Sequence, residues 1–141
     1  MNNIDIKKEI RETLETKQLT CVISNNNKIL FTSKDRGVKP IIDFILSFTN
    51  DDTFYLADKV IGKAAALLCV KAKINYVFTK VISSPAKTIF DKYGISYEFD
   101  SEVPAIQNRT KTDLCPMEGL AKGVETPEEM YKKIVLWLAS K

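Results

Sequence analysis

The stretch FYLADKVIGKAAALLC, residues Phe54–Cys69, decides the fold of this chain. Its apolar beginning predicts a buried strand over Thr53–Ala57, and its alanine-rich continuation predicts a helix over Lys59–Lys71. Asp58 is therefore expected at the joint between a strand and the helix that follows it. In open α/β sheets, ligands bind at the carboxyl ends of the strands, so this joint predicts the location of a site.

The composition predicts a single globular domain that spans residues 1–141. Hydrophobic residues make up 45% of the 141 positions and charged residues 28%, which suits a chain with a substantial core. Lys and Arg number 21 against 18 Asp and Glu, and the net charge of +3 is too small to predict nucleic-acid binding. No apolar run approaches the roughly 20 residues that span a bilayer, and no signal-peptide pattern is present. We expect a cytoplasmic protein that binds neither nucleic acid nor a membrane.

The residue types exclude several common chemistries. The chain contains no histidine, which removes Ser-His-Asp and Cys-His catalysis and argues against a catalytic zinc site. The cysteines are Cys21, Cys69 and Cys115, an odd number without metal-binding spacing, which fits a reduced setting. Cys21 and Cys69 lie in apolar runs and are expected in the core. We expect no metal and no cofactor.

The other predicted elements alternate between strands and helices. They are an N-terminal helix carrying Ile6, Ile10 and Leu14, a hairpin of strands Leu19–Ile23 and Lys28–Thr32, a helix beginning near Pro40, a strand Asn75–Thr79, a helix Pro85–Tyr93, a strand Ile95–Phe99, a loop Ser101–Asp113, and a helix Pro127–Ala139 capped by Thr126. Alternating strands and helices predict parallel pairing with right-handed crossovers, and the hairpin adds an antiparallel edge. We expect a three-layer α-β-α sandwich on a mixed sheet.

This order of elements is similar to that of the cytidine-deaminase-like fold. In that fold, two helices begin at a zinc ion and carry the signatures H-x-E and P-C-x-x-C, which supply the zinc ligands and a general acid/base Glu. Here the corresponding positions are Asp58–Val60 and Ser83–Lys87, which keep only the proline. The resemblance therefore implies the fold, and the departures from the signatures argue against zinc-dependent deamination.

More specifically, the chain resembles a family of small prokaryotic proteins with this fold, the domain-of-unknown-function family 1893. The residues that carry the resemblance are Gly37–Pro40, Asp58–Ala66, Asn108–Arg109 and Cys115–Glu118. They are spread from the end of the hairpin to near the last helix, so the resemblance covers most of the chain. It supports the fold and implies no particular reaction.

Charged and small residues at the joint after the first central strand predict an anion site. Lys59 and Lys63 are four residues apart and share a face of the predicted helix. Gly62 allows a ligand to approach closely, and the N–H groups of the first helical turn favour an anion. Asp58 would orient the ligand or act as a general base. The structural alternative is that Asp58 is an N-cap, the lysines are solvated and Gly62 only relieves packing.

A second candidate group surrounds Cys115. Pro116 is favoured at the first position of a helix, so the Cys115 thiol would lie at the positive end of a helix dipole, which lowers the pKa of a thiol. Cys115 would then be a nucleophile or a ligand contact, with Glu118 one turn further on. Alternatively, Cys115 is a small buried residue and Glu118 caps its own helix.

Two further groups are candidates for ligand binding. Asn108 and Arg109 lie in the predicted loop, where Arg109 could hold a carboxylate or phosphate with two hydrogen bonds. A surface turn is the alternative there. Ser83 and Ser84 stand before Pro85, where capping the next helix is favoured, although Ser84 could also offer a hydroxyl to a ligand.

Two functional hypotheses follow from these residues. The first is a metal-independent or degenerate enzyme that acts on a small anionic or nucleotide-like ligand, with Asp58 and Cys115 as the catalytic residues. The second is a non-catalytic module that senses such a ligand or joins a partner protein. Apolar residues on the first and last helices are compatible with a homodimer.

Overall fold

Six helices and five strands form within the residues that the computed structural model describes, which are 3–35, 37–47, 53–106 and 116–140. The helices are α1 (Asn3–Thr16), α2 (Lys39–Ser47), α3 (Lys63–Lys71), α4 (Ser84–Tyr93), α5 (Pro116–Ala121) and α6 (Pro127–Ala139). The strands are β1 (Cys21–Ser24), β2 (Ile29–Ser33), β3 (Phe54–Ile61), β4 (Ile74–Ser83) and β5 (Ser96–Val103).

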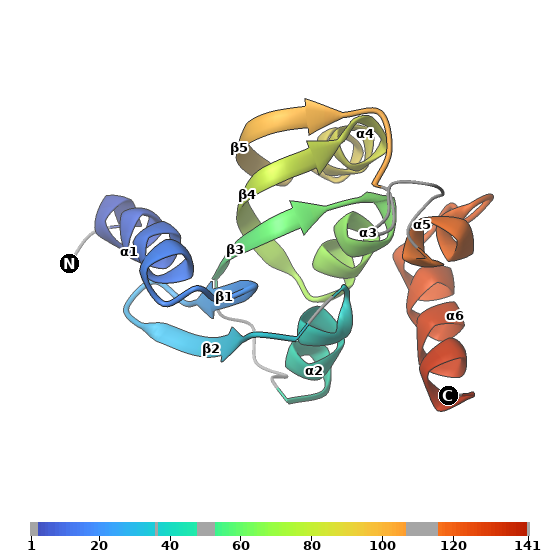
Figure 1. The fold of residues 1–141 in the computed structure, drawn as a ribbon, viewed down its shortest axis with the longest axis horizontal. Coiled ribbons are helices and arrows are strands. Elements are labelled where there is room, and N and C mark those ends of the chain that lie inside the picture. The colour runs from blue at the N-terminus through green and yellow to red at the C-terminus, as the bar shows by residue number, and fades with distance from the viewer. Residues whose placement is uncertain (1–2, 36, 48–52, 107–115, 141) are drawn as a thin grey trace.

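The five strands form one mixed sheet in the order β2-β1-β3-β4-β5. Strand β1 runs antiparallel to both β2 and β3, whereas β3, β4 and β5 run parallel. The arrowheads of the three parallel strands therefore point to the same edge of the sheet (Figure 1). The predicted mixed sheet with an antiparallel hairpin and parallel strands is confirmed.

Each face of the sheet has its own core. On one face, α1 places Ile6, Ile10 and Leu14 against residues of β1, β3 and β4, and all three side chains are fully buried. Their spacing of four residues puts them on one side of the helix. On the other face, α2, α3 and α4 cover the strands, and α5 and α6 pack against α3 (Figure 1). Because the apolar side of α1 packs within the chain, that helix does not support the expectation of a homodimer.

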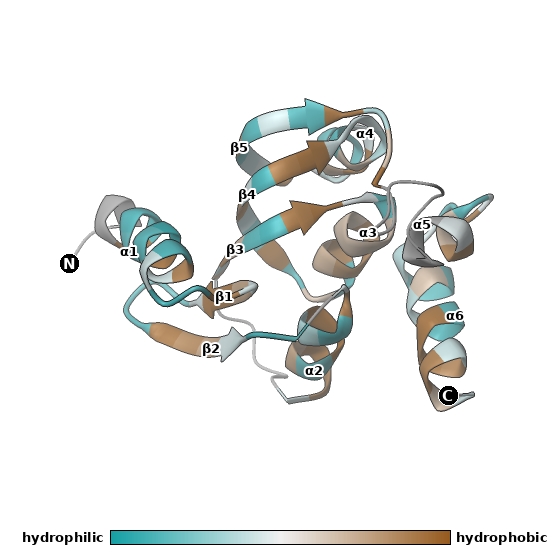
Figure 2. Cartoon of the chain, viewed as in Figure 1, coloured by the Kyte–Doolittle hydropathy of each residue, from teal (hydrophilic) through white to brown (hydrophobic). Residues whose placement is uncertain are grey.

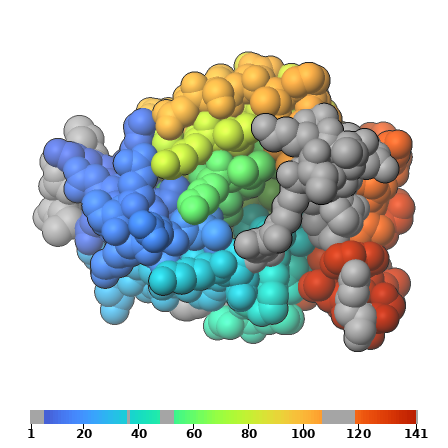
Figure 3. All heavy atoms as spheres, in the orientation of Figure 1, coloured from blue at the N-terminus to red at the C-terminus, as the bar shows by residue number. Residues whose placement is uncertain are grey.

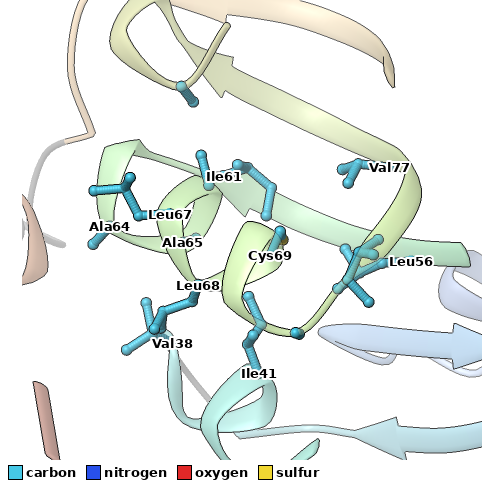
Figure 4. Packing of buried hydrophobic residues seen from close by; sticks show 14 of the residues in the cluster. Val38, Ile41, Leu56, Ile61, Ala64, Ala65, Leu67, Leu68, Cys69 and Val77 are labelled. Atoms are coloured by element: carbon cyan, nitrogen blue, oxygen red, sulfur yellow. The ribbon is translucent and has the colours of Figure 1, made fainter. Parts of the chain in front are cut away.

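Helix α3 lies at the centre of the larger core. Its first alanines, Ala64 and Ala66, are fully buried or nearly so, and their small side chains allow close approach between helix and sheet. Figure 4 shows Cys69 on the side of α3 that faces the strands and Leu68 on the side that faces Val38. The outer helix α6 contributes Ile134 to the same core. The predicted core position of Cys69 is confirmed.

Helix α1 is also fixed along its flank by charged side chains. The guanidinium carbon of Arg11 lies 4.1 Å from the centroid of the Phe78 ring. Nη2 of Arg11 is also 3.3 Å from Oδ1 of Asp100. One turn earlier, Nζ of Lys7 lies 4.4 Å from the Tyr76 ring. Figure 3 shows α1 alongside β4, where these contacts are made.

The two central strands share an irregularity at the same register position. Leu56 and Ile61 both belong to the core around α3, although residues an odd number apart in a regular strand point to opposite faces. The alternation is therefore interrupted after Asp58. In β4, Val77 and Ile82 repeat this pattern, and they are the register partners of Leu56 and Ile61. In Figure 2 a hydrophilic band crosses the central strands between their apolar parts.

The parallel strands are longer than the sequence predicts. Strand β3 continues to Ile61 instead of ending at Ala57, and β4 continues to Ser83 instead of Thr79. Strand β5 includes the first residues of the segment predicted to be a loop. Strand pairing explains the difference, because the ladder between β3 and β4 continues through their polar residues. No helix in the described ranges is both long and apolar enough to cross a membrane.

Candidate functional site

Two helices begin at the carboxyl ends of neighbouring parallel strands. Gly62 alone separates the end of β3 from α3, and β4 leads directly into α4 at Ser84. We call the segments Ile61–Lys63 and Ser83–Pro85 the α3/α4 edge. Because ligands of open α/β sheets bind outside the carboxyl ends of the strands, this edge is the candidate site.

The structure corrects the predicted joint at Asp58. Asp58 and Lys59 both lie within β3, four and three residues before Gly62. Lys59 and Lys63 therefore belong to a strand and a helix, and they do not share a helix face as predicted. The structural alternative for Asp58 is wrong as well, because Gly62 is the N-cap of α3. Strand β3 continues past this charged residue because its ladder with β4 extends to Ile61.

Asp58 is instead a buried carboxyl inside the sheet, only 6% exposed. Its register partners are Cys21 in β1 and Thr79 in β4. Oδ1 of Asp58 accepts a hydrogen bond from the N–H of Val60, with an N to O distance of 3.2 Å. Burial raises the pKa of Asp58 to about 7, although the N–H groups of Val60 and Lys59 and the Cys21 thiol oppose the rise. The folded protein therefore holds the proton of Asp58 more tightly than an exposed aspartate would.

Two buried thiols lie near this carboxyl. Burial raises the pKa of the Cys21 thiol well above its ordinary value, and the negative charge of Asp58 adds to the effect. The same two causes, burial first, raise the pKa of Cys69. Both thiols are fully buried, so they are core residues as predicted and not ready nucleophiles.

The beginning of α3 differs from the beginnings of α4 and α6. Gly62 has no side chain to cap α3, and the first turn of α3 contains no acidic residue but begins with Lys63. In α6, Thr126 accepts a hydrogen bond from the N–H of Glu129, and the first turn carries two glutamates. The positive end of the α3 dipole therefore has no carboxylate from its own first turn. The backbone of Gly62 is extended, a conformation open to any residue.

The serines before Pro85 are both engaged within the protein. Oγ of Ser83 accepts a hydrogen bond from the N–H of Ala86 and caps α4, as predicted. The Ser84 hydroxyl donates to Oε2 of Glu102 in β5 at 2.7 Å. Nζ of Lys87 lies 2.9 Å from the other carboxylate oxygen of Glu102. The hydrogen bond from Ser84, followed by the one from Lys87, holds the pKa of Glu102 below its ordinary value.

The second predicted group falls largely outside the described residues. Asn108, Arg109 and Cys115 lie in the segment 107–115, which the structure does not describe. Glu118 lies in α5, and only its place in that helix is described. That these residues form one site with Asp58 and Lys63 therefore stays a prediction.

A family of proteins of unknown function matches most of this chain. The family model described as TM1506, domain of unknown function (DUF1893), matches residues 9–136. The chain belongs to the DUF1893 family. A DUF1893 family protein from Thermotoga maritima, TM1506, is 30% identical in sequence. Its crystal structure superposes with a TM-score of 0.86 over 93% of this chain and 88% of that chain. The resemblance to this family that the sequence indicated is confirmed.

The DUF1893 fold of this chain is also similar to that of a deaminase. A dCMP deaminase from the cyanophage S-TIM5, in its apo form, superposes with a TM-score of 0.52. The two sequences are 12% identical, and the match covers 70% of this chain and 98% of that chain. At this identity the likeness concerns the fold alone, which confirms the predicted deaminase-like architecture. No curated protein matches the sequence.

The described residues at the α3/α4 edge of this DUF1893 chain do not fit the zinc ion that zinc deaminases hold. The α3/α4 edge offers Gly62, Lys63, Ser83, Ser84 and Pro85, none of which is an imidazole or a thiolate ligand. Within the described ranges, no three His, Cys, Asp or Glu side chains lie close enough together to hold a metal ion. No step of a mechanism is therefore assigned to zinc.

Sequence reasoning missed the relation between Asp58 and Cys21. The thiol comes from the hairpin, and its pairing with β3 depends on an antiparallel register that no local pattern states. It also missed Glu102, which binds Ser84 and Lys87, because the pairing of Glu102 with β4 extends β5 into the segment predicted to be a loop. Apolar residues at Tyr97, Phe99 and Val103, with the polar Ser101 as the one exception, were the available signal for a longer strand.

Proposed function

We propose that this protein binds a small anionic, nucleotide-like ligand at the beginning of α3, and that it does so without zinc. The observation that carries the proposal is the composition of the first turn of α3. It has a glycine N-cap without a capping side chain, no acidic residue, and Lys63 at its first position. N–H groups without a capping side chain and a lysine at a helix N-terminus attract an anion.

The position of this turn supports a ligand of the kind that deaminases recognise. The turn lies at the carboxyl edge of the parallel strands, where ligands of open α/β sheets bind. A chain of similar fold is a dCMP deaminase, whose substrate by name is a nucleoside monophosphate. A nucleoside monophosphate fits both observations. Its phosphate is the anion that the α3 turn favours, and its nucleoside is the part of the ligand that a deaminase of similar fold recognises.

The state of the side chains around the edge favours binding over turnover. Asp58 is buried and accepts a backbone hydrogen bond, so it is a poor candidate for contact with a ligand. Ser83 caps α4 and Ser84 donates to Glu102. A ligand-sensing module therefore agrees with the described residues better than an enzyme does. An enzyme would depend on Cys115, the reactive group that the sequence offers.

The test is a calorimetric titration of chelator-treated protein with dCMP, with deoxycytidine as the ligand that lacks the phosphate. We expect dCMP to bind and deoxycytidine to bind at least tenfold more weakly. The variant Lys63→Glu should lose tenfold or more in affinity for dCMP, because it places a carboxylate beside the helix N-terminus.

A matched charge reversal in α6, Lys132→Glu, serves as the control and should leave the affinity within twofold. Equal losses in the two variants, or the absence of binding by any nucleotide tested, would contradict the proposal. Chromatography of dCMP incubated with the protein and with Cys115→Ser distinguishes the two functional classes. A product that only the unmodified chain forms would establish an enzyme, and unchanged dCMP would support the sensing module.

A further inference from the structure

Asp58 occupies the last position of β3 that is paired with β1. Strand β1 begins at Cys21, and Cys21 is the register partner of Asp58. Beyond this pair, the N–H of Lys59 donates to the carbonyl oxygen of Thr20 with an N to O distance of 3.3 Å, which is longer than most such bonds. We call Thr20, Cys21, Asp58 and Lys59 the β1/β3 corner. The ladder between these two strands therefore ends at a buried acid.

The groups around the Asp58 carboxyl do not supply a neutralising partner. From β1 it meets the Cys21 thiol, and from α3 its charge acts on the Cys69 thiol; burial raises the pKa of both thiols far above neutrality. Strand β4 contributes the hydroxyl-bearing Thr79 as its register partner. On its own strand, Lys59 exerts only a minor attraction, and its side chain is exposed. Within the described residues, Asp58 forms no ion pair.

A buried carboxyl in this position favours its neutral form. Ionisation places a charge among apolar atoms of the core, where desolvation is costly unless water or a cation reaches it. The pKa of Asp58, raised by burial to about 7, agrees with this surrounding. The negative charge of ionised Asp58 is therefore least costly when water can reach the carboxylate.

Solvent-exposed residues adjoin the β1/β3 corner. Val60, two residues after Asp58, is already 42% exposed, and Thr20 is partly exposed. Thr20 is also tied to β2 and to the turn after it, because its hydroxyl lies 3.0 Å from the carbonyl oxygen of Ser33 and 2.6 Å from that of Asp35. Thr20 and Cys21 can thus separate from β3 while β1 remains attached to β2. Cys69, in contrast, lies deep between α3 and the sheet (Figure 4).

We propose that Asp58 makes the β1/β3 corner pH-sensitive: the corner is closed while the carboxyl is neutral and opens to water when the carboxyl ionises. Opening separates Thr20 and Cys21 from Asp58 and Lys59, hydrates the carboxylate and exposes the Cys21 thiol. The Cys69 thiol stays buried. The device is independent of the ligand proposed above.

The test measures how fast iodoacetamide alkylates Cys21 and Cys69 in the folded chain between pH 5.5 and pH 7.5. Rates are assigned by peptide mass spectrometry and divided by the rate for free glutathione at the same pH, which removes the ordinary thiolate dependence. Linkage to a carboxyl whose pKa rises from 3.8 to about 7 predicts that the normalised rate at Cys21 increases about 20-fold. Cys69 should change less than twofold.

The matched variant is Asp58→Asn, which keeps the size and the acceptor oxygen but cannot ionise. In this variant the normalised rate at Cys21 should change less than twofold over the same range. A flat rate at Cys21 in the unmodified chain, an equal rise in the variant, or a rise at Cys69 as large as that at Cys21 would overturn the proposal.

A second readout needs no variant. The amide proton of Lys59, bonded to Thr20, should lose protection against hydrogen exchange with rising pH, after correction for intrinsic exchange. Amide protons inside α3 should keep theirs. Protection that stays constant at Lys59, or that falls equally in α3, would overturn the proposal even if Asp58→Asn did not fold.

Discussion

Asp58 of β3 and Thr79 of β4 are register partners, and each bonds to the backbone two residues further along its own strand. Oδ1 of Asp58 accepts from the N–H of Val60, and the Thr79 hydroxyl donates to the carbonyl oxygen of Val81 at 3.0 Å. Both residues are buried. Such local bonds compete with regular strand geometry, and here they accompany the interrupted alternation of both central strands.

The Thr79 hydroxyl is expected to contribute to stability. Thr79→Val removes the donor to Val81 inside the sheet and should lower the free energy of unfolding by about 1 kcal/mol. Urea denaturation at constant pH measures the change. Thr88→Val is the control, because the Thr88 hydroxyl bonds to a backbone carbonyl on the exposed side of α4. An equal loss in the two variants would show that burial of the Thr79 bond does not matter.

Asp58 is expected to make stability depend on pH. Its folded-state pKa of about 7 lies above the unfolded value of 3.8, so the folded protein binds the proton more tightly. This contribution is complete below about pH 4, is lost as the pH rises towards 7, and is constant at higher pH. Relative to Asp58→Asn, the protein should lose on the order of 2–3 kcal/mol of unfolding free energy between pH 5 and pH 8. A difference that grows in the opposite direction would contradict the raised pKa.

Arg11 is expected to stabilise the packing of α1 through its aromatic contact as well as through its ion pair. The pair with Asp100 is about half exposed, and such pairs contribute roughly 0.2–1 kcal/mol. The contact with the Phe78 ring adds a comparable amount and does not need Asp100. Arg11→Ala should therefore cost more than Asp100→Asn. A double-mutant cycle by chemical denaturation should give a coupling energy below about 1 kcal/mol, and equal costs would contradict the aromatic contribution.

The Ser84 hydroxyl is expected to control the ionisation of Glu102. Its hydrogen bond is the largest cause of the lowered pKa of that carboxyl, followed by Lys87. Ser84→Ala should therefore raise the pKa of Glu102 towards its ordinary value, and Lys87→Met should raise it as well. NMR titration of the glutamate side-chain carbons measures both shifts. An unchanged pKa in Ser84→Ala would contradict the role of the hydroxyl.

The sequence was sufficient for the fold because its strongest signals are local. Pro85 and Gly94 mark the limits of α4, and Gly94 adopts the left-handed conformation, with φ of 71°, that favours glycine at a helix end. Thr126 marks the beginning of α6 in the same way. These signals arise from backbone sterics and hydrogen bonding within a few residues, so they do not depend on the rest of the chain.

The candidate site was harder to predict because strand length depends on partners. Asp58 and Lys59 resemble the end of a strand in sequence, but pairing with β4 carries β3 on to Ile61. That extension moved Asp58 into the core and left Gly62 and Lys63 at the beginning of α3. A charged residue inside a central strand is recognisable only when the neighbouring strands are known. An anion site at this helix N-terminus stays a prediction, and it now rests on Gly62 and Lys63 without Asp58 and Lys59.

The direct succession of β3, α3 and β4 has a consequence for the order in which the chain folds. Residues 54–83 contain two parallel strands and the helix that covers them, with no long loop between them. Contacts that close short stretches of chain form fastest, so we expect this unit to be the folding nucleus. Leu67→Ala in α3 should slow folding, whereas Met130→Ala in α6 should mainly speed unfolding, although both side chains are fully buried. A nascent chain could then establish its parallel topology before its last helix has been synthesised.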